Sequence, residues 1–372
     1  MEWTPIAVLP NINVRDGIEG GQIALVASDD PRVDSAAAKQ RTFRTFVGRF
    51  TDPFRRPIRP SVLIARGQLS DRLRRGEMLS SFRDLISLCA VIRGRSLQLK
   101  NGGSQGVTYA DAFAIYPWMV SRDGKGLVGT TPAILGFDEV KTFRGQSSPE
   151  IFASELRSFE MDGPLLAELI NYWNRRYFGR ASDWKHVALF RSLNMAFHAS
   201  RLPAGIDTRS LDLGRMLALW VSAFEILAHP KIGRSGTGSV FRLLNSVSWQ
   251  DRDCRRRRFK AGEKQANVTQ KSTLACWLYA QLYEARNHFL HGNPLGRRTG
   301  LVPKTNRHLL MFAAPLYRMA LTGYLDLRWS EPLPPATDYD AYWSAVRKQH
   351  FTFTQYQDDV ETALLTSRKK GH

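Results

Sequence analysis

The stretch YEARNHFLHGNPL, residues 283–295, carries side chains that could do phosphate chemistry at the end of a predicted helix. Arg286 offers a planar fork of donors that fits a phosphate, and His291 can take up or release a proton near neutral pH. Gly292 is expected to end the helix as its C′ residue, and Pro294 prevents the helix from continuing. His291 then lies at the negative end of the helix dipole, which favours a protonated imidazole. An arginine near a protonatable histidine supplies the groups that phosphodiester cleavage needs.

The helix that positions these residues is expected to span 271–291 and to bury one face. At about 100° per residue, five apolar side chains fall on one stripe, which is the core face. Asn287 and His291 fall on a neighbouring stripe together with Glu284, whereas Arg286 emerges on the other flank, about 140° from His291. The expected core stripe consists of Leu274, Leu278, Leu282, Ala285 and Phe289.

Two other interpretations of these residues stay open. A histidine near a helix C-terminus is often only a partner of the helix dipole, and Arg286 could form a surface ion pair with Glu284 or Asp251. A metal site is the other interpretation, because His288 and His291 are three residues apart on a helix. Two histidines without a carboxylate on the same face are, however, a thin ligand set for zinc.

The charge of the chain indicates an anionic partner. Its 372 residues include 53 Lys and Arg against 34 Asp and Glu, which gives a net charge of +19. Such an excess attracts polyanions at long range, and nucleic acid is the commonest of them. A membrane surface would also attract it. No stretch approaches the roughly 18–20 apolar residues that span a bilayer, so we expect no insertion into a membrane.

Cysteine usage and the first residues indicate a cytoplasmic protein. The three cysteines, Cys89, Cys254 and Cys276, are odd in number and far apart. This argues against a disulfide framework or a zinc site and fits a reducing compartment. The opening residues MEWTPIAVLPNINVRDG lack a basic segment followed by an apolar one, so no signal peptide is expected.

Residues 1–155 are predicted to form a mixed α+β domain. Short β-like runs (IAVL, QIALVAS and PSVLIA) alternate with two basic helical stretches, AAAKQRTFRTFVGRF and SDRLRRGEMLSSFRDLISLCAVI. RSLQLKNGGSQGV, residues 95–107, is expected to be a strand leading into a Gly-rich turn. The basic helices could face RNA or simply be solvated, and solvation is the favoured interpretation. No activity is assigned to this domain, which could serve recognition, regulation or the binding of a partner protein.

From about residue 162 the pattern is helical, and residues 162–330 are predicted to form an all-α bundle. The overall fold class is therefore α+β, with a mixed N-terminal region followed by this bundle. Residues 331–372 are expected to be a linker followed by a small helical basic tail. The expected helices span 163–178, 182–200, 207–229, 239–249, 271–291 and 305–329, the last with Pro315 inside it.

The motif RNHFLHG and the helix before it resemble the HEPN superfamily, and within it the Apea-like branch. The family signature is an arginine followed four to six residues later by a histidine, and Arg286 and His291 fit that spacing. The stretch LALWVSAFEILAHP resembles the family's preceding helix. Its Glu225 has apolar neighbours, where a carboxylate is costly unless it is paired. The resemblance implies that Glu225 orients Arg286 or His291; a glutamate that only caps a neighbouring helix is the alternative.

The resemblance covers roughly residues 162–330 and implies an endoribonuclease that needs neither metal nor cofactor. The RNA 2′-hydroxyl would attack the phosphate and leave a 2′,3′-cyclic phosphate, with His291 as general base or acid and Arg286 stabilising charge at phosphorus. Asn287 would fix this pair or hydrogen-bond the phosphate. The family usually places two such helices across a twofold axis, which implies a homodimer with a composite site. A toxin subgroup has a modifiable tyrosine where this chain has Asn293, so that form of regulation is not expected.

The loop before the helix adds candidate RNA-binding residues, with His288 on the helix itself. The loop residues are expected either to track phosphates beside the site or merely to be solvated. The main rival function is a non-catalytic RNA- or protein-binding HEPN module in a defence or regulatory complex, and charge alone also suggests a DNA-associated regulator. A role as toxin or antiviral effector is a family association only. The loop residues are Arg255, Arg256, Arg257, Arg258 and Lys260.

Overall fold

The chain divides into two compact units. The first takes residues 1–87, 109–160 and 169–182, and the second takes 88–108, 161–168 and 183–372. Helices and sheets are both present, so the fold class is α+β, as predicted. The predicted ranges 1–155, 162–330 and 331–372 differ from these units, because two helices are shared and the C-terminal segment belongs to the second unit. The computed structural model describes residues 3–39, 41–52, 54–67, 76–103, 106–116, 118–120, 127–129, 154–179, 183–202, 210–233, 235–261, 270–293, 298–327, 335–345 and 352–368.

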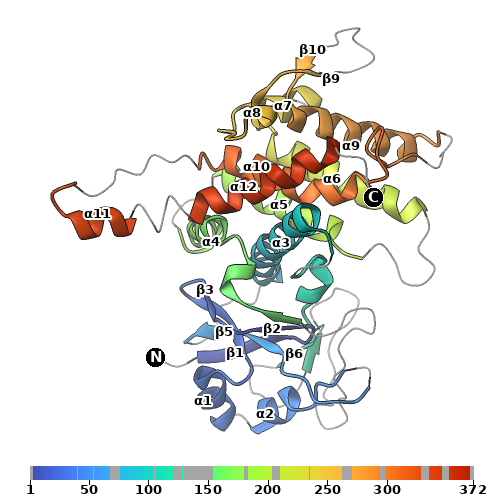
Figure 1. Ribbon diagram of the computed structural model, residues 1–372. Coiled ribbons are helices and arrows are strands. Elements are labelled where there is room, and N and C mark those ends of the chain that lie inside the picture. Colours follow the sequence, from blue (N-terminus) through green and yellow to red (C-terminus); the bar gives the residue numbers. More distant parts are fainter. Residues whose placement is uncertain are drawn as a thin grey trace. The chain divides into compact units, whose positions relative to one another are not determined.

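The first unit is built on a four-stranded antiparallel sheet in the order β1-β5-β4-β3 (Figure 1). β1 (Trp3–Leu9) pairs with β5 (Ser61–Arg66), β5 pairs with β4 (Ile23–Ala27), and β4 pairs with β3 (Ile18–Glu19). The three apolar runs predicted as strands form β1, β4 and β5. Two short pairs accompany this sheet: β2 (Ile12–Val14) with β8 (Ser154–Leu156), and β6 (Trp118–Val120) with β7 (Leu127–Gly129).

Two helices, α1 (Pro31–Lys39) and α2 (Arg41–Val47), cover one face of this sheet. The first basic stretch, predicted as one helix, contributes to both of them. Its phenylalanines point inward and Arg44 is exposed, because only the apolar face gains from burial. The shared core consists of Val8, Ala24, Val26, Val33, Ala37, Phe43, Phe46, Phe50, Val62 and Ile64.

Helix α3 (Gly76–Asn101) corrects two expectations from the sequence. Residues 95–107 were predicted to be a strand and turn, but up to Asn101 they continue this helix. The second basic stretch was expected to be solvated, yet most side chains between Met78 and Ile92 are buried. Residues 96–100, SLQLK, alternate polar and apolar side chains, and this period of two is that of a strand. The helix is shared between the units, which divide after Ser87.

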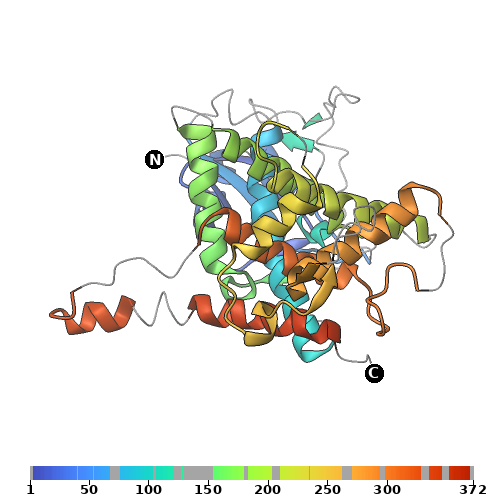
Figure 2. The same cartoon turned by 90° about the horizontal axis from the view of Figure 1, so that it is seen from above.

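The second unit is a bundle of helices. α6 packs against α5, α9 and α10, and α10 also packs against α12 (Figure 2). Pro315 lies inside α10, as predicted. The helices are α4 (Gly163–Phe178, shared with the first unit), α5 (Trp184–Ala199), α6 (Ser210–Leu227), α7 (Thr237–Asn245), α8 (Arg252–Arg255), α9 (Leu274–Leu290), α10 (Leu310–Tyr324), α11 (Tyr339–Ala345) and α12 (Thr352–Leu365), with a 3₁₀ turn at Thr366–Arg368. Two other 3₁₀ turns, Ala110–Phe113 and Ser158–Glu160, belong to the first unit.

Ion pairs connect the helices of this bundle to one another and to neighbouring segments. Arg318 of α10 is completely buried, and its Nε donates to Asp162 Oδ2 over 2.9 Å. Asp359 of α12 pairs with Arg93 and, over 2.6 Å, with Lys100. The C-terminal helix is therefore part of the second unit, whereas the sequence predicted residues 331–372 to be a linker followed by a small helical basic tail.

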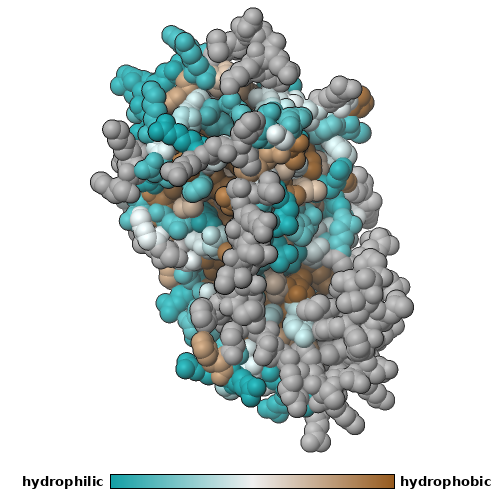
Figure 3. Space-filling model, turned by 90° about the vertical axis from the view of Figure 1, so that its right-hand side faces the viewer, coloured by the Kyte–Doolittle hydropathy of each residue, from teal (hydrophilic) through white to brown (hydrophobic). Residues whose placement is uncertain are grey.

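The outer surface mixes polar and apolar residues. On the face seen in Figure 3, hydrophobic patches lie among hydrophilic residues. Large apolar side chains exposed on the second unit include Ile232 and Leu290. Of the helices within the described ranges, none has the length and apolar character to cross a lipid bilayer.

Candidate functional site

Helix α9 carries the predicted site, and it begins at Leu274 rather than at 271. Thr273 is the N-cap, and its side-chain oxygen accepts a hydrogen bond from the Cys276 backbone N–H over 3.4 Å. Such a cap satisfies one of the free N–H groups of the first turn and fixes the start of the helix. The three residues before it form β10 (Gln270–Ser272), which pairs with β9 (Phe259–Ala261).

The end of α9 is as predicted. His291 is the C-cap, and its backbone N–H bonds to the carbonyl oxygen of Asn287. Gly292 has φ +66°, a left-handed conformation that glycine adopts without strain. The Asn293 N–H then reaches the His288 carbonyl over 3.1 Å, which completes the hydrogen bonds of a Schellman-type end. The His291 residue is exposed at this end.

The core stripe of α9 anchors the last turn to α6. Leu274, Leu278, Leu282 and Ala285 are buried, as predicted. Phe289 is only partly buried, but it packs tightly on Gly214 of α6: a methyl group on Gly214 would lie 2.4 Å from Phe289 Cδ1. The absence of a side chain at Gly214 is thus what lets the last turn of α9 approach α6.

The structure joins Arg286 to Asn287. Arg286 Nη1 donates to Asn287 Oδ1 over 2.8 Å, and the guanidinium lies 5.7 Å from the centroid of the Tyr283 ring. Arg286 Nε is buried, and within the described part of the chain it has no hydrogen-bond partner. One donor of the guanidinium is thus oriented by Asn287, and another is shielded from water.

Glu225 on α6 lies within electrostatic reach of Arg286. Burial raises the pKa of Glu225 above its ordinary value, and the Arg286 charge opposes that rise. Among the residues the structure describes, no hydrogen bond or ion pair joins Glu225 to Arg286 or to His291. The position of Glu225 therefore supports an electrostatic influence of its carboxyl group on Arg286. The direct contact that the resemblance implied is not present among these residues.

Tyr279 is a neighbour of this group that the sequence analysis did not single out. It is fully buried, its pKa is raised well above the ordinary value by burial and next by Glu225, and Arg286 lowers it. Its hydroxyl has no hydrogen-bond partner in the described ranges. Tyr279 precedes Tyr283 by one helical turn, so the i, i+4 spacing from 279 to 283 was the available signal.

A single chain does not bring Arg286 and His291 together. Neither a hydrogen bond nor an ion pair links their side chains in the described structure. Arg286 is partly buried beside Tyr283, whereas His291 is exposed at the helix end. This separation agrees with the angle of about 140° expected from the helical spacing.

The basic loop lies at the other end of α9, which corrects the expectation that it flanks the site. Phe259, which directly follows the arginine run, stacks on Trp277 with ring centroids 5.4 Å apart. Trp277 precedes His291 by 14 residues, or about 21 Å along the helix. Asp253 Oδ1 lies 3.0 Å from Arg258 Nη2 and 4.0 Å from Arg256 Nη1. Exposed residues of this loop are Arg255, Arg256, Arg257, Arg258 and Lys260.

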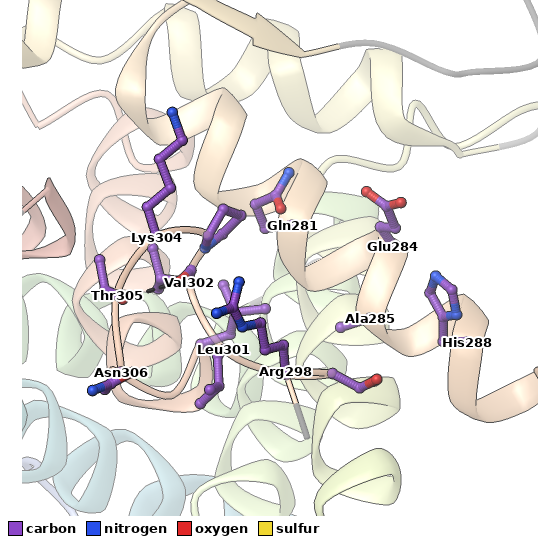
Figure 4. Close-up of a pocket in the computed structure, with 14 residues that line it drawn as sticks. Gln281, Glu284, Ala285, His288, Arg298, Leu301, Val302, Lys304, Thr305 and Asn306 are labelled. Carbon is purple, nitrogen blue, oxygen red and sulfur yellow. Dashed lines mark hydrogen bonds between the residues drawn. The ribbon is translucent and has the colours of Figure 1, made fainter. Parts of the chain in front are cut away.

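His288 lines a pocket that the sequence did not predict. The pocket has a volume of about 710 Å³ and lies between one side of α9 and the loop 298–309 (Figure 4). It was missed because the loop has no helical or strand periodicity and its position follows only from tertiary packing. The lining residues are Gln281, Glu284, Ala285, His288, Arg298, Thr299, Gly300, Leu301, Val302, Pro303, Lys304, Thr305, Asn306 and Leu309.

Over the ranges that the structure describes, His, Cys, Asp and Glu side chains form no group of three or more that could hold a metal ion. Comparison with known protein families, curated proteins and solved structures gives no match to this chain.

Proposed function

We propose that the protein is a metal-independent endoribonuclease of HEPN type, acting as a homodimer and serving as a toxin or defence effector. The single observation that carries the proposal is the last turn of α9, where Arg286 is tied to Asn287 and an exposed His291 closes the helix. The net charge of +19 supports RNA as the substrate, because it attracts a polyanion.

Each group of the turn has a role in this reaction. His291 takes the proton of the RNA 2′-hydroxyl, and the 2′-oxygen forms a bond to phosphorus. Arg286 stabilises the charge that develops on the phosphoryl oxygens, oriented by its hydrogen bond to Asn287. The bond between phosphorus and the 5′-oxygen breaks, the leaving oxygen takes a proton from water, and His291 returns its own proton to water. The products are a 2′,3′-cyclic phosphate and a 5′-hydroxyl. Glu225 tunes the electrostatic field at Arg286.

The homodimer follows from the divergence of the two side chains. Because Arg286 and His291 point apart on one helix, one phosphate reaches both more easily when they come from different protomers. Leu290, beside His291, is 54% exposed, which is a costly position for a large apolar side chain unless a partner covers it.

A mixing experiment tests the composite site. Arg286→Ala and His291→Ala are each expected to be inactive or severely impaired. After the two variants are denatured together and refolded, each heterodimer has one site with an intact arginine and an intact histidine. About a quarter of wild-type cleavage should then return, since half of the dimers are mixed and half of their sites are intact. Absence of any recovery would count against the sharing of residues.

Substitutions at Arg286 and His291 separate binding from cutting. His291→Ala should abolish cleavage while RNA affinity stays within a few-fold, since counterion release dominates binding. Arg286→Lys should retain affinity better than rate, because the bidentate fork is lost. Arg242→Ala is the matched control, an exposed arginine on α7 outside the site. An equal loss of affinity and rate in His291→Ala would contradict its role as a proton carrier.

A non-catalytic RNA-binding role is the second candidate function. The observation that favours it is the aromatic stack of Phe259 on Trp277 with Arg258 and Arg368 over the Phe259 ring, at 5.7 and 5.8 Å. Exposed arginines next to aromatic rings are typical of surfaces that bind single-stranded nucleic acid. RNA that binds tightly and emerges uncut from a prolonged incubation would favour this function over cleavage.

A further inference from the structure

The tight turn that follows α2 carries a phenylalanine at its tip and arginines around it. Residues 41–60 include six arginines and one acidic residue, so this stretch is far more basic than the chain as a whole. Three of its four phenylalanines, Phe43, Phe46 and Phe50, are buried in the core of the first unit. Phe54 is instead 67% exposed, so its ring lies at the surface among arginines.

The turn is fixed by hydrogen bonds between its own residues. The Asp52 carboxylate accepts from the backbone N–H groups of Phe54 and Arg56, each over 2.8 Å. The Asp52 N–H donates to the Arg56 carbonyl and the Arg55 N–H to the Asp52 carbonyl, each over 2.9 Å. The Phe54 ring is thus presented on an ordered backbone, which lowers the entropy that a ligand must spend on ordering the turn.

The carboxylates of this turn are already engaged, and its cations are exposed. Asp52 accepts the two backbone N–H groups, and Asp29 is paired with Arg59 at 3.0 Å. In the described part of the chain, no ion pair involves Arg55 or Arg56. Both arginines are exposed, and the Arg56 guanidinium lies 5.7 Å from the centroid of the Phe54 ring. The turn therefore combines a flat apolar ring with cations beside it.

Arg55 places its charged side chain where the backbone favours glycine. Its φ of +65° is a left-handed conformation that is unfavourable for a residue with a Cβ atom. Such conformations persist where the surrounding structure fixes them, and they are concentrated at sites that hold ligands. The hydrogen bonds of Asp52 supply that restraint here.

We propose that this turn binds single-stranded RNA, with one base stacked on Phe54 and the neighbouring phosphates bound by Arg55 and Arg56. Every base offers a flat face to an aromatic ring, and a guanidinium donates paired hydrogen bonds to a phosphate. An acidic peptide would pair with the arginines but would leave the ring in water. The choice of RNA rests on the proposed function. The turn belongs to the first unit and α9 to the second, so the first unit recruits the RNA that the second cuts.

Two labelled chains of about 12 nucleotides, a length that single-strand-binding surfaces cover, test the stacking in the full-length protein by fluorescence anisotropy. One is a 2′-O-methyl RNA that cannot be cleaved, and the other is an abasic sugar-phosphate chain of the same charge. Phe54→Ala should weaken RNA binding about 5- to 150-fold, the range of base–aromatic stacking, and abasic binding less than about twofold. Phe54→Trp should keep the RNA affinity. Phe159→Ala is the matched control, because Phe159 is 62% exposed on the same unit, and RNA affinity should be unchanged in it.

An arginine substitution tests the phosphate contacts separately. Arg55→Gly removes one cation and suits the left-handed backbone. It should weaken the binding of both chains and reduce the slope of log affinity against log salt concentration by about 0.7. Arg242→Ala, an exposed arginine on α7, is the control and should leave the slope unchanged.

Equal RNA affinity in Phe54→Ala and Phe159→Ala, in proteins that unfold in urea like the wild type, would overturn the proposal. So would an equal loss with the abasic chain, because the ring would then contact no base. Binding to phosphatidylserine vesicles that depends on Phe54, with RNA binding unaffected by Phe54→Ala, would assign the turn to a membrane surface instead. Because neither probe is turned over, Phe54-dependent RNA binding by a protein that cuts no RNA would remove the ribonuclease function and leave this site standing.

Discussion

Gly214→Ala is expected to disturb the last turn of α9 through a single methyl group. The new Cβ would lie 2.4 Å from Phe289 Cδ1 and 2.5 Å from Cγ. Carbon atoms pack at about 3.5–4.0 Å, so the ring must retreat by about 1 Å or more. Phe289 lies between Arg286 and His291 in the sequence, and its retreat carries that turn away from α6.

The effect on stability has two opposing parts. Overpacking costs about 1–3 kcal/mol, and replacing glycine by alanine within a helix returns about 0.5–1 kcal/mol. Gly214→Ala should therefore lower the free energy of unfolding by about 0–2.5 kcal/mol. Gly238→Ala on α7 is the matched control, because its Cβ would meet no atom within 4 Å. It should instead raise stability by about 0.5–1 kcal/mol.

Urea unfolding and RNA cleavage measure the two consequences. A displacement of about 1 Å at a catalytic group can lower the rate about 100-fold, so Gly214→Ala should lose far more activity than stability. Adding Phe289→Leu to Gly214→Ala should recover part of both, which shows coupling between the two sites. If Gly214→Ala were as stable and as active as Gly238→Ala, the described packing of α6 on α9 would be wrong.

Three further predictions concern the fold that holds the site. Asp162→Asn removes the charged partner from a buried ion pair with Arg318 and should cost about 3–5 kcal/mol in urea unfolding. Asp29→Asn, which breaks the exposed pair with Arg59, should cost less than about 1 kcal/mol. Equal costs would contradict the burial of the first pair. Leu282→Asp buries an unpaired charge and should unfold the helical unit, which circular dichroism would detect. Leu290→Asp, at an exposed position, should remain folded. A folded Leu282→Asp variant would refute the helix register. Burial raises the folded-state pKa of Glu225 above 4.5, so the folded chain holds that proton more tightly and stability falls as pH rises between the unfolded and folded pKa values. Glu225→Gln removes this loss of stability. The difference in free energy of unfolding between the variant and the wild type should therefore grow in the variant's favour from acid to neutral pH. A difference that is constant with pH would count against the raised pKa of Glu225.

Local signals in the sequence predicted much of the helical unit. α4 has the predicted bounds 163–178, since Pro164 suits the first turn of a helix and Gly179 follows its end. The end of α9 was predicted from Gly292 for the same kind of reason. α3 was misread from Arg95 on, because the polar and apolar residues of SLQLK alternate as they do in a strand.

The sequence indicates which residues make up the candidate site, but not which contacts those residues make. The types and spacing of Arg286, Asn287 and His291 single out the turn, since the angles between side chains of one helix follow from their spacing in the sequence. The contact of Phe289 with Gly214 and the position of the arginine loop at the far end of α9 depend on tertiary packing. The pocket depends on the loop 298–309, whose path is set by hydrogen bonds between residues that no sequence period relates.

The most direct test of the central claim is to map the ends of RNA incubated with purified protein in the presence of EDTA. The wild type should produce 2′,3′-cyclic phosphate and 5′-hydroxyl ends. His291→Ala should produce none, and His198→Ala, which removes an exposed histidine from the last turn of α5, should cleave like the wild type. Intact RNA with the wild type, ends of another chemistry, or equal cleavage by His291→Ala would contradict the account.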